Sequence, residues 1–106
     1  MIEEIYLKFH LPIGQFLFLN FDNNISEEIL NSITNLRYQG IICELYPSNV
    51  KIKKQLDYAN KKNFDFVVLI GEDEIKNDSF VLKNMDSGEQ NSYKMNTIED
   101  QIKKLI

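Results

Sequence analysis

The stretch Phe66-Val-Val-Leu-Ile-Gly-Glu-Asp-Glu74 decides how the rest of the chain must fold. It begins with five consecutive apolar residues, most of them β-branched. A continuous run of this kind is typical of a strand covered on both faces, as in a parallel sheet. The sequence therefore predicts a central strand over Phe66–Ile70, with Gly71 and three carboxylates opening a helix after it.

Two similar strand-to-helix units precede this stretch. Gln15–Phe21 is an apolar and aromatic run that predicts a buried strand. A helix is expected to follow it, with Ser26 as its N-cap and Gly40 closing it. Ile41–Leu45 predicts a second strand, and Lys51–Lys62 a second helix. Three such units in a row predict a parallel sheet.

The pattern changes after residue 78. Ser79–Asn84 alternates between apolar and polar residues, Asp86-Ser-Gly88 has turn chemistry, and Glu89–Lys94 can form another strand. Strands separated by so few residues favour antiparallel pairing at a sheet edge. Thr97 with Asp100 predicts a capping box that opens a last helix. The fold class is therefore α/β, with a five-stranded mixed sheet flanked by helices.

The totals limit the classes of function. A chain of 106 residues fits one domain, and a formal net charge of -4 argues against nonspecific binding along nucleic-acid phosphates. A local basic patch can still meet a few phosphates. We expect no membrane segment and no signal peptide, and the single cysteine indicates a reduced, cytoplasmic chain.

The first twelve residues differ from the rest. Ile2, Ile5, Tyr6 and Phe9 form an apolar helical stripe before Pro12. We expect residues 1–12 to be a helical tail or the remnant of a preceding catalytic core, and residues 13–106 to be the domain itself.

Nucleophilic, metal and phosphate-loop chemistry find little support. Cys43 lies mid-strand, where a buried thiol is expected, and the only histidine, His10, is far away along the chain. Gly71 is followed directly by Glu72 and its two acidic neighbours, which would repel a phosphate. The sequence therefore predicts no catalytic residue and no metal site.

Charged residues remain as candidates for binding. Glu72 and Glu74 can accept hydrogen bonds from the N–H groups of an unstacked guanine, or they can simply face water. The helix 51–62 carries five lysines and one acid, which indicates either a solvated face or a strip for phosphates. Lys83, in the strand beside the acidic turn, could contact a base or a phosphate. Tyr46 and Tyr58 could stack on bases, or lie at the core margin with their hydroxyls in water.

Five segments in a fixed order resemble one known family, the C-terminal anticodon-binding domain of histidine–tRNA synthetases. They are Gly40-Ile-Ile-Cys-Glu-Leu-Tyr-Pro47, Lys53-Lys-Gln-Leu-Asp-Tyr-Ala-Asn-Lys61, Phe66-Val-Val-Leu-Ile-Gly-Glu-Asp-Glu74, Phe80-Val-Leu-Lys-Asn-Met85 and Ser87-Gly-Glu-Gln90.

The resemblance implies a three-layer α/β/α domain with a mostly parallel sheet and one reversed strand. It implies tRNA anticodon binding, with the catalytic core and a second copy of the protein as candidate further partners, and neither DNA nor membrane. Under this hypothesis Glu72 and Glu74 read bases and Gly71 lets RNA approach the backbone. Lys83 contacts a base or phosphate. The anticodon backbone is held by Lys51, Lys53, Lys54 and Gln55.

The chain also departs from a complete synthetase. It has one arginine, Arg37, and lacks the arginine-rich motifs of a catalytic sheet. We therefore expect no cofactor in this chain, since ATP and magnesium would belong to the absent catalytic core. Three alternatives stay open: an interdomain or dimerisation module without RNA contact, a free-standing regulatory homologue, and a doubly wound phosphoacceptor domain using Asp22.

Overall fold

A computed structural model of the chain describes residues 15–21 and 26–105. The expected tail 1–12, with His10, and the alternative acceptor Asp22 lie outside the described residues. Five strands form one sheet in the order β2-β1-β3-β4-β5. Their bounds are Gln15–Phe18 (β1), Ile42–Leu45 (β2), Phe66–Leu69 (β3), Ser79–Asn84 (β4) and Gln90–Lys94 (β5).

The strand directions confirm the predicted mixed sheet. β1 runs parallel to both β2 and β3, whereas β4 is antiparallel to β3 and β5 is antiparallel to β4. β4 is therefore the one reversed strand. The crossover helices make the parallel order possible, and the short turn between β4 and β5 makes the hairpin, with Gly88 at a φ of +80°.

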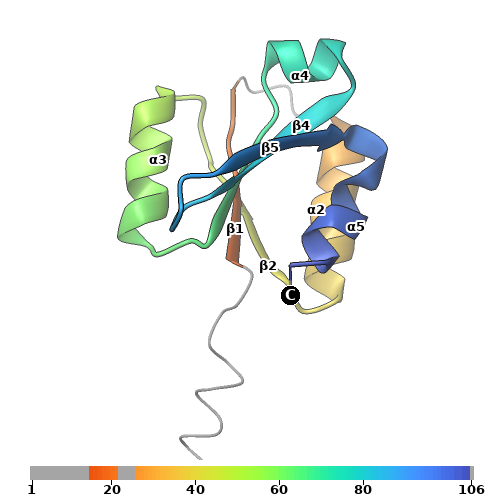
Figure 1. Cartoon of the computed structure of the whole chain (residues 1–106), viewed down its shortest axis with the longest axis horizontal. Helices are drawn as coiled ribbons and strands as arrows, with labels where there is room; N and C mark the ends of the chain where they lie inside the picture. The colour runs from red at the N-terminus through yellow and green to blue at the C-terminus, as the bar shows by residue number, and fades with distance from the viewer. Residues whose placement is uncertain (1–14, 22–25, 106) are drawn as a thin grey trace, which may run out of the picture.

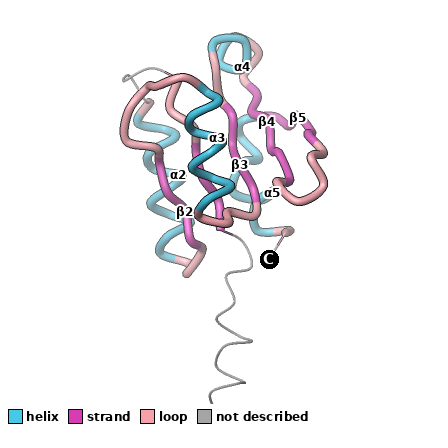
Figure 2. The backbone as a smooth tube through the Cα atoms, turned by 90° about the vertical axis from the view of Figure 1, so that its left-hand side faces the viewer, coloured by secondary structure: helices cyan, strands magenta, loops and turns pink. Residues whose placement is uncertain are grey.

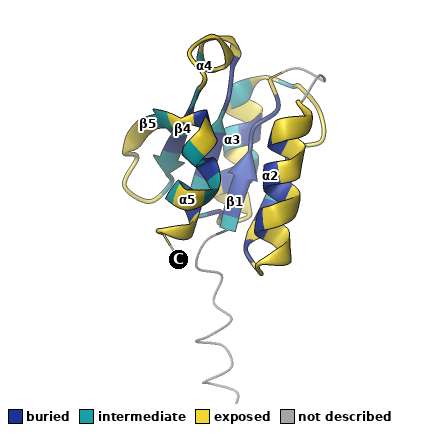
Figure 3. Cartoon of the chain, turned by 90° about the vertical axis from the view of Figure 1, so that its right-hand side faces the viewer, coloured by how far each residue is buried: buried dark blue, intermediate teal, exposed yellow. Residues whose placement is uncertain are grey.

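The sheet forms the middle of three layers, with helices on both of its faces (Figure 1). Helix α2 (Glu27–Tyr38) and helix α5 (Ile98–Lys103) lie on one face, and helix α3 (Ile52–Lys61) lies on the other. The short helix α4 (Glu72–Lys76) follows β3, and a 3-10 turn, η1 (Met95–Thr97), precedes α5. In Figure 3, α2 turns its buried side toward the sheet and its exposed side outward.

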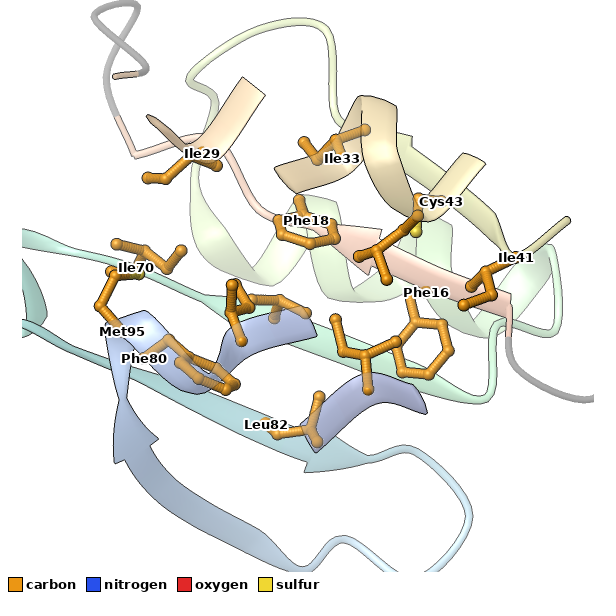
Figure 4. Close-up of a cluster of buried hydrophobic side chains, with 14 residues drawn as sticks. Phe16, Phe18, Ile29, Ile33, Ile41, Cys43, Ile70, Phe80, Leu82 and Met95 are labelled. Atoms are coloured by element: carbon orange, nitrogen blue, oxygen red, sulfur yellow. The ribbon is translucent and has the colours of Figure 1, made fainter. Parts of the chain in front are cut away.

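Alternate residues of each strand feed two separate apolar clusters. Phe16 and Phe18 point toward α2 and α5, whereas Leu17 and Leu19 point toward α3. The cluster on the α2 side also contains the side chains labelled in Figure 4, among them Ile29, Ile33, Ile70, Phe80, Leu82 and Met95. Each fully buried side chain of this size contributes roughly 1.5–3 kcal/mol to stability.

Two predicted helix ends are confirmed and one is wrong. Ser26 caps α2, since its Oγ accepts a hydrogen bond from the Ile29 amide at 3.2 Å. Gly40 follows the end of α2 with a φ of +86°, a conformation that glycine adopts without strain. The expected capping box at Thr97 does not form. Its hydroxyl donates back to the carbonyl of Lys94 at 2.7 Å, because the 3-10 turn brings that carbonyl within reach.

Candidate functional site

The carboxyl ends of β1, β2 and β3 meet at one edge of the sheet, because the three strands are parallel. Helices α3 and α4 begin at this same edge, at the top of Figure 1. We call it the carboxyl edge and define it by residues 19–21, 46–51 and 70–72. Open α/β sheets bind their ligands at such an edge.

A pocket of about 510 Å³ opens at the carboxyl edge on the side of α2. Its walls are largely apolar and include Phe21 and Ile75, which are 37% and 61% exposed. Gly71 and Glu72 also line it. Two of the residues predicted to form the site therefore border a real concavity.

Gly71 does not offer open backbone to an approaching ligand. Its amide donates a hydrogen bond of 2.7 Å to Oε1 of Glu74, and the residue is buried. A Cβ at this position would lie 3.0 Å from that same oxygen and 3.5 Å from the ring of Phe21. The glycine leaves room for the Glu74 carboxylate, so the expectation that it admits RNA is corrected.

Glu72 and Glu74 are not brought together. Glu72 lines the pocket on the α2 side, and Glu74 does not. Side chains two residues apart on a helix are rotated by about 200° around its axis. The carboxylates of Glu72 and Glu74 therefore project to opposite sides of α4. A single base therefore cannot accept contacts from both carboxylates at once.

Three predicted lysines gather at the first turn of α3. Lys51, Lys53 and Lys54 are all exposed. The N-cap position is Lys51, whose side chain makes no capping hydrogen bond, and the first turn contains no acid. Positive side chains at the positive end of a helix dipole are unfavourable without an anionic partner. This end of α3 is therefore suited to bind an anion.

Gln55 was expected on the RNA backbone, and the structure corrects this expectation. Its side chain has no solvent exposure. The side-chain oxygen and nitrogen bond to the backbone of Asn20 and Val50. A side chain enclosed in this way cannot contact a ligand at the surface.

Lys83 lies away from the acidic turn. In the antiparallel pairing it is opposite Val67, four residues before Gly71, so roughly 13 Å of strand separates Lys83 from that glycine. It alternates with the buried Leu82 and therefore points toward the α3 side. Figure 2 shows no helix in front of β4 and β5 on this side. We call this surface the open sheet face and define it by Val81, Lys83, Gln90 and Ser92.

Sequence reasoning missed one polar contact at the carboxyl edge and misplaced another between α3 and β2. Asn20 is buried and its side-chain amide donates to the carbonyl of Tyr46 at 3.1 Å. The hydroxyl of Tyr58 is not free in water but donates to Glu44 at 2.6 Å, and this hydrogen bond raises the pKa of Tyr58. Tyr46 packs edge-on against Tyr58. The one available signal was the polar Asn20 at the end of an apolar run.

The buried thiol of Cys43 is poorly suited to act as a nucleophile. Cys43 is buried, and burial raises the pKa of its thiol to about 11. Within residues 15–21 and 26–105 no group of three or more His, Cys, Asp or Glu side chains could hold a metal ion. None of the helices described is long and apolar enough to cross a membrane.

Comparison with known proteins identifies the fold. A family model described as "Anticodon binding domain" matches residues 12–105. The histidine–tRNA ligase of Cytophaga hutchinsonii is 50% identical over 86 residues, which cover 81% of this chain and 18% of that protein. The enzyme of Christiangramia forsetii is 40% identical over 87 residues, which cover 82% and 19%. The chain thus spans about a fifth of these relatives.

Solved structures of aminoacyl-tRNA synthetases contain a domain of the same fold. A histidyl-tRNA synthetase from Nostoc matches 97% of this chain and 26% of its own, with a TM-score of 0.75 and 25% identity. The RNA binding domain of a Cryptosporidium parvum threonyl-tRNA synthetase matches 87% of this chain and 23% of its own. Its TM-score is 0.71 at 16% identity, a likeness of fold alone. The chain therefore belongs to the anticodon binding domain family.

Proposed function

We propose that the chain binds the anticodon stem-loop of a tRNA, and that its cognate is histidine tRNA. The family match and the names of the relatives support this assignment. The observation that carries it in this chain is the group of three exposed lysines at the uncapped first turn of α3. In a chain of net charge -4 these lysines form a local positive site at the carboxyl edge.

Affinity and specificity come from different residues in this proposal. Lys51, Lys53 and Lys54 contact phosphates of the loop, and Lys83 contacts a base or phosphate on the open sheet face. Carboxylates can accept hydrogen bonds from splayed bases, and Glu74 and Glu72 offer them on opposite sides of α4. The RNA partner is a single-stranded loop, not duplex DNA.

The parent reaction would be ATP-dependent attachment of histidine to its tRNA in the cytoplasm. The catalytic core would carry that chemistry together with ATP and magnesium, and this chain would contribute no cofactor. Its partners would then be the tRNA and the catalytic core, with a second copy of the protein as a further candidate.

Titration with an RNA hairpin that carries the histidine anticodon loop tests the proposal. We expect binding that weakens with salt, because phosphate contacts release counterions. A hairpin with another anticodon loop but the same stem should bind less tightly. Equal affinity for both hairpins would refute base reading, and no binding to either would refute RNA binding.

One observation favours a second role in docking. The pocket on the α2 side is largely apolar and has Ile75 at its border, 61% exposed. An exposed apolar surface of this kind suits contact with the catalytic core or a second copy. Sedimentation of the chain without RNA at increasing concentration would detect self-association, and Ile75→Ser should weaken it.

A further inference from the structure

Gln55 uses its whole carboxamide inside the protein. Its Oε1 accepts a hydrogen bond from the Asn20 amide at 2.8 Å, and its Nε2 donates to the Asn20 carbonyl, also at 2.8 Å. Nε2 donates a second bond of 2.8 Å to the carbonyl of Val50. We call these three bonds the Gln55 clamp. The carboxamide both accepts from and donates to the backbone of Asn20, as the backbone of a neighbouring strand would.

The Gln55 clamp joins three segments of the carboxyl edge. Asn20 follows β1, and Val50 directly precedes Lys51 at the start of α3. The Asn20 side chain extends the connection to the carbonyl of Tyr46, just after β2. The loop that leads into α3 is therefore held near both of its ends against the end of β1.

Only a carboxamide can make this set of bonds. The clamp needs one acceptor and two donors on the same planar group, which Gln provides. A carboxylate would face two carbonyl oxygens, and an apolar side chain would leave the backbone groups of Asn20 and Val50 without these partners. The requirement at residue 55 is therefore for hydrogen-bonding chemistry and not only for filled volume.

The geometry points to Gln55 as a positioning residue for RNA binding, a role that rests on the proposed function. Lysine side chains are long and flexible, so their charges are directed only as well as their backbone is held. Lys51, Lys53 and Lys54 lie within four residues of Gln55, in a helix turn that has no side-chain cap. The Gln55 clamp fixes this turn against the sheet, and the three lysines thereby reach the RNA phosphates together.

A double-mutant cycle tests this role. The four proteins are the wild-type chain, Gln55→Met, the triple variant Lys51→Gln/Lys53→Gln/Lys54→Gln, and the combination of both. Affinity for the histidine anticodon hairpin is measured at a temperature where circular dichroism shows every protein folded. If Gln55 acts through the lysines, Gln55→Met should weaken binding about tenfold when they are present and less than about twofold when they are absent.

A purely structural role would give a different result, namely the same factor in both backgrounds, and that outcome overturns the inference. It is also overturned if the wild-type chain binds RNA and Gln55→Met binds equally well. Absence of wild-type binding would instead refute the proposed function, and this inference with it. Leu36→Ala, on the far face of the sheet, serves as a destabilised control that should keep its RNA affinity.

A measurement on the wild-type chain keeps the inference testable if Gln55→Met fails to fold. In nuclear magnetic resonance spectra of the complex, we expect no intermolecular Overhauser effect between the Gln55 side-chain amide and RNA. The first-turn amides of α3 should shift on binding. A direct effect from the Gln55 amide to an RNA proton would make it a contact residue and overturn its positioning role.

Discussion

The carboxylate of Glu74 accepts a hydrogen bond from the amide of Gly71 at 2.7 Å, closing the first turn of α4 onto the end of β3. The acid proposed to read a base is thus also part of the local structure. Its Oε1 is occupied by the backbone, so within the described residues a base would have to be read by Oε2. Substitutions at Glu74 will affect both stability and binding, and the two effects must be separated.

We predict that Glu74→Gln keeps the chain folded but weakens binding of the cognate hairpin. The amide oxygen of glutamine can still accept from Gly71, whereas the negative charge offered to a base is lost. Glu74→Ala should in addition lower the free energy of unfolding by about 1 kcal/mol, the usual effect of a lost capping bond. Urea unfolding and hairpin titration measure the two effects.

Asp73→Asn is the matched control, since Asp73 is exposed in the same turn. Its hairpin affinity should stay near that of the wild-type chain. In a full synthetase, Glu74→Ala should raise the KM for tRNA and leave adenylate formation intact. Unchanged tRNA kinetics would remove Glu74 from the site.

The triple variant Lys51→Gln/Lys53→Gln/Lys54→Gln should bind RNA more weakly and with a smaller salt dependence. Each phosphate contact on a single strand contributes about 0.7 to the slope of log affinity against log salt concentration, so the slope should fall by about 2. The variant should be as stable as the wild-type chain or slightly more stable, because repulsion with the helix dipole is relieved.

Lys61→Gln/Lys62→Gln is the control for that variant. These exposed lysines lie at the opposite end of the same helix, so the control removes two positive charges, against three in the triple variant, at a distance from the carboxyl edge. A slope change of the same size per lysine removed would mean that net charge, and not the position of the lysines, governs binding.

Arg37 covers the unpaired edge of strand β2. Its Nε donates to the carbonyl of Cys43 at 2.9 Å. The backbone groups of successive strand residues point to opposite neighbouring strands. The Tyr46 amide bonds to β1, so the backbone groups of Cys43, three residues earlier, point away from β1. Arg37→Leu should lower the free energy of unfolding by about 1–2 kcal/mol and promote concentration-dependent association through β2.

Sedimentation and urea unfolding would check this prediction, with Lys104→Leu as an equally apolar exposed substitution elsewhere. If Arg37→Leu stays monomeric at concentrations where the wild-type chain does, the protective role of Arg37 at the edge is wrong.

Cys43 should make the chain less stable in strongly alkaline solution. Its thiol has a pKa of about 11 in the folded chain against 9.0 for an unperturbed thiol, so the unfolded state loses its proton first. The contribution is fully present below pH 9 and is lost as the pH rises toward 11, and it amounts to roughly 2–3 kcal/mol. The difference in unfolding free energy between the wild-type chain and Cys43→Val should follow this dependence. A difference that is constant from pH 8 to pH 11 would contradict it.

Much of the fold follows from local patterns in the sequence. The strand predicted over Ser79–Asn84 has those same bounds in the structure, because alternation along a half-buried strand is visible in six residues. The cap at Ser26 was predictable for the same reason, since a cap involves residues only three apart. Thr97 failed because a 3-10 turn, set by the packing of Met95 and Ile98 in the core, precedes the helix.

The sequence by itself determined the elements, the family resemblance and the acidic turn after the central strand, since these depend on residues close together along the chain. Only the tertiary structure decided which polar residues are available to a ligand. Gln55 is enclosed because its partner Asn20, 35 residues away, lies against it. Lys83 is distant from Gly71 because the register of β3 with β4 sets its place. The divergence of Glu72 and Glu74 already follows from helical periodicity, and the tertiary structure decided only that Glu72 is the one that lines the pocket.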